Sequence, residues 1–147
     1  MTKTDVKWDG KQYSVELTPS ARFRHFYKRK MQKLLSVSVP KQITSQTIRV
    51  SFTQYGNRHL YSDAIGRNQV LQRSDLLNLD DALKRSHYLK TTPSFKPRKD
   101  GIDKFHYFET LIHGSRVYLN VAEKKIVGND GHVRLSRFVY SITDKMK

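Results

Sequence analysis

Three β-patterned segments near the C-terminal end constrain the fold more than any other feature of the chain. In each segment, β-branched and aromatic residues alternate with polar ones, which is typical of half-buried strands. The segments are residues 104–113, 116–124 and 133–142. Glycine-containing turns at Gly114-Ser115 and over residues 127–132 separate them, and short turns of this kind join antiparallel neighbours. We therefore predict an antiparallel meander of three strands.

A further turn signal lies near the N-terminus, where Asp9-Gly10 separates two alternating segments. Asp-Gly suits a two-residue type I′ turn, because both central positions of that turn need a positive φ. The turn predicts a β-hairpin over residues 5–17. A two-residue loop would set the register of this hairpin, with Trp8 opposite Lys11 and Val6 opposite Tyr13.

Three other segments have the periodicity of amphipathic helices. Thr18 and Pro19 suit the N-cap and first position of the first helix, and Asn57 suits the N-cap of the second. The predicted helices cover residues 18–36, 58–66 and 76–89. A strand is predicted at residues 47–53, and loops at residues 36–46 around Pro40 and at residues 90–101. The second loop is a candidate for a mobile flap over a substrate.

The length of 147 residues favours one domain. Within it, residues 1–36 are predicted to form a basic hairpin–helix extension of a core over residues 47–144. The chain has no cysteine, which excludes disulfides and thiolate metal sites. No stretch approaches the ~18 apolar residues of a membrane span. We therefore expect a folded domain without a membrane partner.

Positive charge is the strongest global signal. Lysine and arginine number 28 against 13 aspartates and glutamates, which gives a net charge of +15 and a pI near 10.1. A domain this basic attracts polyanions, chiefly nucleic acid. The alternatives are a solvated basic helix and an acidic protein partner. The side chains expected to contact nucleic acid lie in the first helix and the second loop, and they are Arg22, Arg24, Lys28, Arg29, Lys33, Lys96, Arg98 and Lys99.

Residues 55–68 crowd together groups that can transfer protons. Arg58, His59 and Asp63 would occupy the first turns of the predicted helix, with Asp63 placed to orient the imidazole. Histidine suits either proton role in RNA cleavage because its unperturbed pKa is near 6.5. The N-terminus of the helix would favour a bound phosphate. The alternative is an ordinary exposed His–Asp pair on a helix surface.

A polar stripe runs along one face of the middle C-terminal strand, and it consists of Arg116, Tyr118 and Asn120. On the last strand, alternation places Tyr140 with Phe138 and Ile142 on one face, and Val139 with Ser141 and Thr143 on the other. Arg116 with Ser141 or Thr143 is therefore a candidate phosphate site on the sheet surface. The alternative is an ordinary solvent-facing side of a sheet.

The order of elements and four sequence motifs carry a family resemblance. The motifs are "LLNLDDALKRSHYLK", "HYFET", "YLNVAE" and "YSITD". From about Ile48 to Asp144, the chain resembles phage- and mobile-element-encoded members of the barnase–EndoU–colicin–RelE ribonuclease superfamily. The resemblance implies an α+β fold in which N-terminal helices pack on a curved antiparallel sheet. It also implies metal-independent RNA cleavage by a toxin-like protein, with the active site between helix and sheet.

The combined hypothesis is a metal-independent endoribonuclease that needs no cofactor. His59 is predicted to be its base or acid, Arg116 and Arg58 would stabilise the phosphate, and Thr143, Ser141 and Tyr118 would assist. His106 is either a general acid or a buried structural residue. The expected partners are RNA and a cognate antitoxin or immunity protein, with a cytoplasmic site of action reached by delivery from a producing cell or phage. The alternative is a non-catalytic nucleic-acid-binding module of a phage or mobile element.

Overall fold

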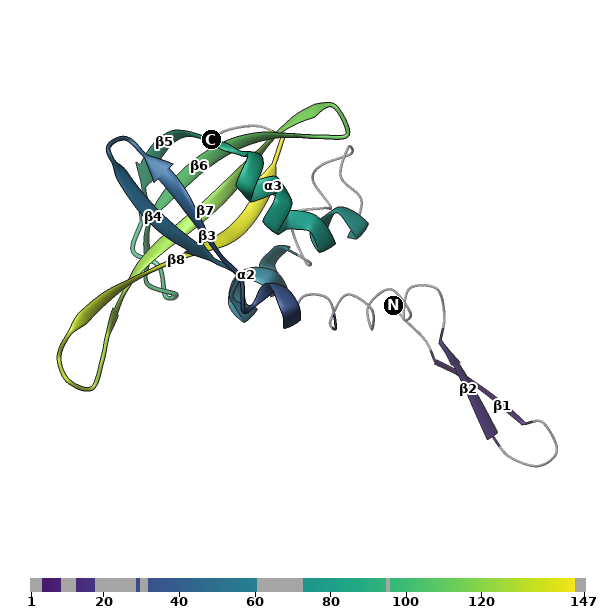
Figure 1. Cartoon of the computed structure of the whole chain (residues 1–147). Coiled ribbons are helices and arrows are strands. Elements are labelled where there is room, and N and C mark those ends of the chain that lie inside the picture. The colour runs from purple at the N-terminus through teal and green to yellow at the C-terminus, as the bar shows by residue number, and fades with distance from the viewer. Residues whose placement is uncertain are drawn as a thin grey trace. The chain divides into compact units, whose positions relative to one another are not determined.

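A computed structural model describes residues 4–8, 13–17, 29, 32–60, 73–94 and 96–144 (Figure 1). The chain divides into two compact units, Met1–Lys33 and Leu34–Lys147. In the first unit, β1 (Thr4–Trp8) pairs antiparallel with β2 (Tyr13–Leu17). Trp8 lies opposite Tyr13 and Val6 opposite Val15, so the predicted two-residue turn with Trp8 opposite Lys11 is wrong. The predicted helix over residues 18–36 lies largely outside the described residues, and the backbone is helical at Arg29 and residues 32–34.

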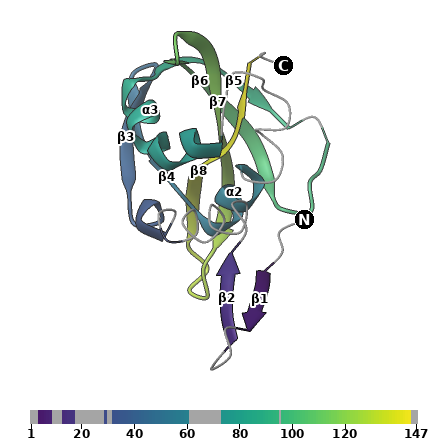
Figure 2. The ribbon, with the colours of Figure 1, turned by 90° about the vertical axis from the view of Figure 1, so that its right-hand side faces the viewer.

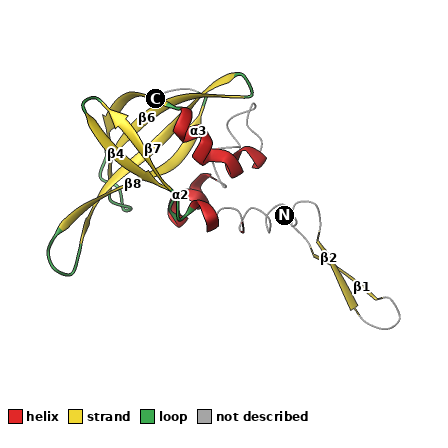
Figure 3. Cartoon of the chain, in the orientation of Figure 1, coloured by secondary structure: helices red, strands yellow, loops and turns green. Residues whose placement is uncertain are grey.

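The second unit is built on a six-stranded sheet with the order β3-β4-β8-β7-β6-β5. Its strands are β3 (Ser38–Ile43), β4 (Gln46–Ser51), β5 (His87–Pro93), β6 (Ile102–Ile112), β7 (Ser115–Val127) and β8 (Val133–Thr143). Neighbouring strands are antiparallel except β4 and β8, which are parallel where Ser51 lies opposite Phe138. The α+β class is confirmed, but the sheet is mixed rather than antiparallel throughout. Figure 3 shows that this curled sheet makes up most of the unit.

The predicted meander is confirmed as β6, β7 and β8, with one shift at the first turn. Ile112 lies opposite Ser115, and the two residues between them, His113 and Gly114, have φ values of 53° and 77°. Positive φ at both central positions is characteristic of a type I′ turn, whose twist matches that of the flanking strands. The turn therefore lies one residue earlier than the predicted Gly114-Ser115.

Besides the helical backbone at residues 29 and 32–34, the described residues contain three bounded helical elements. They are α2 (Gln54–His59), the 3-10 helix η3 (Arg73–Asn78) and α3 (Leu79–Arg85). The helix predicted over residues 76–89 ends at Arg85, because Ser86 has an extended backbone and its hydroxyl donates to the carbonyl oxygen of Leu83. His87 and Tyr88 belong instead to the edge strand β5. The predicted loop over residues 36–46 contains β3, where Pro40 is tolerated because an edge strand needs no donor on its outer side.

The core lies on the inner face of the curled sheet, beneath α3 (Figures 1 and 2). Inward side chains from β6, β7 and β8 meet the apolar side of α3, which packs against β6 and β3. The most completely buried of them include Phe108, Val117, Leu119, Val121, Val139, Ile142, Leu79 and Leu83. Burial of this aliphatic and aromatic surface is the main term that stabilises the unit.

A β-bulge at Tyr140 changes which side chains of β8 face outward. Val139 lies opposite Val121 and Ser141 opposite Asn120, so Tyr140 is the extra residue between two ladder positions. The predicted alternation is therefore wrong for two residues, because Val139 and Ile142 both face the core. Tyr140 does lie with Phe138, and Ser141 and Thr143 lie together opposite Asn120 and Tyr118 of β7. The rings of Tyr140 and Phe138 both contact Tyr55 of α2, a position that the candidate site uses.

Gly56 allows α2 to approach this part of β8. A Cβ atom at Gly56 would collide with the carbonyl oxygen of Val139 and would lie 3.0 Å from the Phe138 ring. A residue with a side chain would therefore hold the helix backbone farther from the strand. The close approach brings the last residue of α2, His59, against the bulged Tyr140.

Candidate functional site

His59 lies at the end of α2 rather than at the beginning of a helix. Thr53 is the N-cap, and its hydroxyl accepts a hydrogen bond from the backbone N–H of Gly56 at 3.1 Å. The predicted start at residue 58, with Asn57 as cap, is therefore wrong, and Asn57 is a buried residue within the helix. Most of the predicted helix, including Asp63, lies outside the described residues. His59 consequently loses the predicted helix N-terminus as a phosphate-binding element.

Two contacts fix the His59 ring against Tyr140. The two rings stack with their centroids 3.9 Å apart and an angle of 20° between their planes. His59 Nδ1 lies 2.8 Å from the carbonyl oxygen of Tyr140. Since a carbonyl oxygen only accepts, Nδ1 carries the proton and donates it. In the neutral ring the lone pair is then on Nε2, which makes Nε2 the atom that can take up a proton.

The loop between β5 and β6 brings an arginine to the other side of Tyr140. Arg98 Nη2 donates to the Tyr140 hydroxyl at 2.9 Å, and the guanidinium carbon lies 5.5 Å from the centroids of the Tyr140 and Phe105 rings. Arg98 also donates two hydrogen bonds to the Asp100 carboxylate, from Nε at 3.0 Å and Nη2 at 2.9 Å. The Tyr55 hydroxyl of α2 donates to the same carboxylate at 2.8 Å. We call these six residues the His59–Arg98 cluster: His59, Tyr140, Arg98, Asp100, Tyr55 and Phe105.

The charges within the His59–Arg98 cluster stabilise one another. The hydrogen bond from Arg98 lowers the pKa of the Asp100 carboxyl well below its usual range, outweighing the opposite effect of burial. The hydrogen bond to Asp100 likewise raises the pKa of Arg98. It also raises the pKa of the Tyr55 hydroxyl, together with burial, to about 12. At neutral pH the cluster therefore holds a charged Arg98, an ionised Asp100 and an uncharged Tyr55.

We expect Asp100→Asn to destabilise the protein in a pH-dependent way. Because the folded pKa of Asp100 lies below its unfolded value of ~3.9, its ion pair stabilises the fold above that value. The stabilisation is lost as the pH falls through the folded pKa. Urea unfolding should show a stability deficit of the variant at neutral pH that shrinks below about pH 4. Asp81→Asn, which changes an exposed carboxylate on α3, is the matched control, and an equal deficit in both variants at every pH would contradict the assignment.

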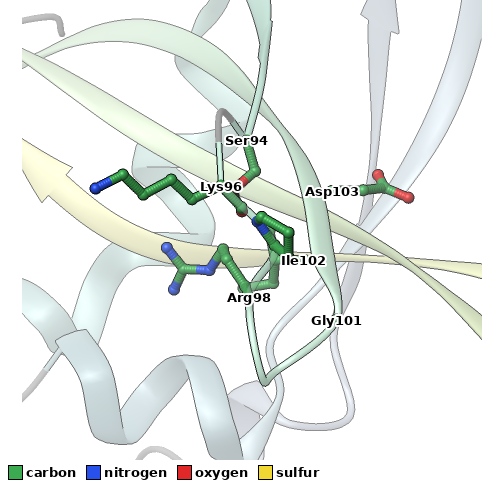
Figure 4. A pocket seen from close by; sticks show the side chains of 7 residues that line it. Ser94, Lys96, Arg98, Gly101, Ile102 and Asp103 are labelled. Atoms are coloured by element: carbon green, nitrogen blue, oxygen red, sulfur yellow. Dashed lines mark hydrogen bonds between the residues drawn. The ribbon is translucent and has the colours of Figure 1, made fainter.

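An open pocket of about 390 Å³ adjoins the cluster through Arg98, and Ser94, Lys96, Pro97, Gly101, Ile102 and Asp103 complete its lining (Figure 4). Lys96 and Arg98 extend to the same side, whereas Asp103 points away from them (Figure 4). Lys96 and the neighbouring Lys99 are exposed to solvent. The pocket therefore presents two cations, one of which binds the Tyr140 hydroxyl, and an anionic ligand is the class it suits.

The other predicted catalytic residues lie elsewhere on the outer face. Ser141 is buried and accepts a hydrogen bond from Asn120 Nδ2 at 2.7 Å, while Tyr118 lies opposite Thr143 one step farther along. Arg116 is four residues from Asn120 on β7, a strand length of roughly 13 Å. Its Nε binds Glu109 Oε1 at 3.0 Å. The structure thus places His59 and Arg98 against the same residue, Tyr140, whereas Arg116 pairs with Glu109.

The predicted cationic residues outside the pocket divide into two groups. Arg58 and Arg29 are exposed, as is Lys33. Arg22, Arg24 and Lys28 lie outside the described residues. That these side chains contact nucleic acid stays a prediction.

Sequence reasoning missed Tyr140, Asp100, Tyr55 and Phe105. Residues 90–101 were predicted as an exposed loop, but residues 90–93 belong to β5, and Arg98 and Asp100 lie in the loop that follows. Nothing local indicated that this loop reaches β8. The contact partners Arg98 and Tyr140 are 42 residues apart, and His59 and Tyr140 are 81 apart.

A second polar cluster, also missed, is buried on the inner side of the sheet. Glu123 Oε1 accepts from His106 Nε2 at 3.0 Å and from Arg137 Nε at 2.7 Å, and Lys104 Nζ lies 3.4 Å from Oε2. His106 Nδ1 lies 2.7 Å from the Thr91 hydroxyl. We call these five residues the Glu123 cluster.

Burial and hydrogen bonding act in opposite directions on Glu123. Burial tends to raise its pKa, but the hydrogen bonds from His106 and Arg137 outweigh burial, and the pKa of Glu123 is lowered. The side chains of His106 and Glu123 are only 4% and 5% exposed. Of the two roles weighed for His106, the structural one fits this burial, because a general acid must reach its substrate.

Comparison with known proteins found no matching family model, no matching curated protein and no matching solved structure. Within the described residues, no group of three or more histidine, aspartate or glutamate side chains is arranged to hold a metal ion. In the same part of the chain, none of the helices has the length and apolar character needed to cross a bilayer. The class that fold and site define is a basic α+β domain with a cationic, aromatic surface site.

Proposed function

We propose that the protein is a metal-independent endoribonuclease whose active site is the His59–Arg98 cluster and its adjoining pocket. The observation that carries the proposal is the stack of His59 on Tyr140, whose hydroxyl Arg98 binds at 2.9 Å. A group that can transfer a proton near neutral pH thus lies beside fixed positive charge. The net charge of +15 supports a polyanionic substrate.

The proposed reaction starts with proton transfer from a ribose 2′-OH to His59 Nε2. The 2′-oxygen attacks the adjacent phosphorus, and the positive charges of Arg98 and Lys96 stabilise the transition-state phosphate. The bond from phosphorus to the 5′-oxygen breaks, and that oxygen takes a proton from the Tyr140 hydroxyl. The products are a 2′,3′-cyclic phosphate and a 5′-hydroxyl. DNA lacks the 2′-OH and is not a substrate of this reaction.

Incubation of the purified chain with total RNA in EDTA tests the proposal. We expect fragments with 2′,3′-cyclic phosphate and 5′-hydroxyl ends, and no cleavage of single-stranded DNA. A 2′,3′-cyclic phosphate blocks ligation of the 3′ end. Fragments that ligate only after polynucleotide kinase has removed this phosphate therefore carry the expected end. Intact RNA, or cleavage that EDTA abolishes, would contradict a metal-independent nuclease.

A second candidate function is nucleic-acid binding without cleavage. One observation favours it: the Arg98 guanidinium already binds both Asp100 and Tyr140. The exposed Lys96 in the pocket and the exposed Lys99 outside its lining are then the nearby cations left to contact phosphate. Binding of this kind is strongly weakened by salt, because each phosphate contact releases counterions. Salt-sensitive retention of RNA that stays intact in the same incubation would identify this function.

The biological setting remains part of the proposal. A toxin-like effector that acts in the cytoplasm and is restrained by an antitoxin or immunity protein is consistent with RNA cleavage by a small basic domain. Inhibition of growth on expression of the chain, relieved by the His59→Ala variant, would support that setting.

A further inference from the structure

The long hairpin of β7 and β8 extends beyond its neighbouring strands. We call residues 124–136 the β7–β8 arm. On one side, the first residue of β6, Ile102, lies opposite Lys124, and on the other, β4 meets β8 at Phe138. Among the described residues, no strand pairs with residues 125–127 of β7 or 133–136 of β8 on their outer sides. Figure 1 shows this ribbon projecting from the sheet, with both backbone edges available for pairing.

One face of the β7–β8 arm is aliphatic and uncovered. Val127 lies opposite Val133, and Leu135 lies opposite Lys125, on the face that continues from the inward residues Val121 and Val139. Val127 is 67% exposed, Val133 58% and Leu135 47%. A two-stranded ribbon is marginally stable on its own, so a third strand or a covering surface would stabilise it. Clustered exposed aliphatics of this kind mark a docking surface.

The charge of the β7–β8 arm selects among possible occupants. The arm contains three cations, Lys124, Lys125 and Arg134, and a single carboxylate, that of Asp130. The Asp130 carboxylate is already bound within the turn, because its Oδ1 accepts a hydrogen bond from the His132 N–H at 3.0 Å. A second copy of this chain, with a charge of +15, would be repelled. The arm contains no tyrosine, phenylalanine or tryptophan on which nucleic-acid bases would stack. An acidic protein segment with aliphatic side chains meets both the charge and the apolar face.

We propose that the β7–β8 arm binds an acidic protein partner, which adds an extended segment along the free edge of β8 and covers Val127, Val133 and Leu135. Backbone pairing supplies the direction of the added strand, alternate side chains cover the aliphatic face, and carboxylates pair with the arm's cations. This surface is distinct from the His59–Arg98 cluster. The proposal holds whether or not the protein cleaves RNA.

The test uses the full chain and a synthetic peptide of alternating valine and glutamate. Titration followed by amide NMR should shift resonances of residues 125–127 and 133–136. The double variant Val133→Ser, Leu135→Ser should bind at least about tenfold more weakly, since two buried aliphatic contacts are lost. Leu111→Ser is the matched control and should bind normally, because Leu111 is equally exposed, at 54%, on the outer face of β6.

Four results would overturn the proposal. The first is no binding, or binding that maps to another surface. The second is equal affinity for a peptide of alternating serine and glutamate, which would show charge attraction alone. The third is a short RNA that shifts the arm resonances and competes with the peptide. The fourth is a dimer in sedimentation that the double variant abolishes, which would make a second copy the occupant.

Discussion

His59→Ala is expected to lower the rate of RNA cleavage at least ~10²-fold, the usual contribution of a positioned general base. The substitution removes the only group in the His59–Arg98 cluster whose ordinary pKa lies near neutrality. Rates measured on a labelled oligonucleotide at saturating enzyme would report the chemical step. The stack on Tyr140 is lost as well, so circular dichroism and urea unfolding must show that the variant is folded.

His87→Ala is the matched control for that experiment. His87 is an exposed histidine on the edge strand β5, and its loss removes an imidazole without touching the cluster. We expect its cleavage rate to equal that of the parent. If the His59→Ala variant is folded and cleaves at the parental rate, His59 has no part in the mechanism. If the His87→Ala variant is equally slow, the effect does not belong to the cluster.

Glu123→Ala is expected to lower the free energy of unfolding by about 3–5 kcal/mol, the effect of removing one partner from a buried ion pair. Arg137, with a side chain only 16% exposed, would be left with a buried charge, and His106 would lose the acceptor of its Nε2 proton. Such a loss is a large part of the 5–15 kcal/mol by which a domain is stable. Urea unfolding, monitored by far-UV circular dichroism, would measure the change in the free energy of unfolding.

Lys104→Ala provides the control for the Glu123 variant. Lys104 contacts the same carboxylate, but its side chain is 46% exposed and its Nζ is 3.4 Å away. We expect a loss of less than about 1 kcal/mol, as for other exposed ion pairs. Equal losses in the Lys104 and Glu123 variants would mean that burial of the carboxylate does not set the energetics of the cluster.

The β-strands were predictable where their alternation was strong. The segments that became β7 and β8 have runs of inward apolar side chains at alternate positions, such as Val117, Leu119 and Val121, which a sheet with one buried face favours. β3 and β5 were not predicted. Pro40 led to the prediction of a loop where β3 lies. β5 directly follows α3, and no glycine between them signals the end of the helix. Both are edge strands, whose sequences are less constrained because only one side pairs.

The candidate site was predictable in its parts but not in its assembly. His59, Arg98 and Lys96 were identified from their chemistry and their surroundings in the sequence. The partner assigned to His59 was Arg116, which instead binds Glu109 on the neighbouring strand. The bulge at Tyr140 leaves Val139 in the core but puts Ser141 on the outer face, while the Tyr140 ring, beside Phe138, is met by α2 and by the loop before β6. Alternation within one strand cannot reveal a bulge, since a bulge is defined by the pairing of two strands.

The sequence by itself determined the α+β class, the three C-terminal strands and the strongly positive charge, because alternation and composition are properties of short segments. Only the tertiary structure decided that His59 and Arg98 both contact Tyr140 and that His106 is buried beside Glu123. Those contacts join residues far apart in the chain, and their geometry depends on strand register, on the close approach at Gly56 and on the path of the loop before β6.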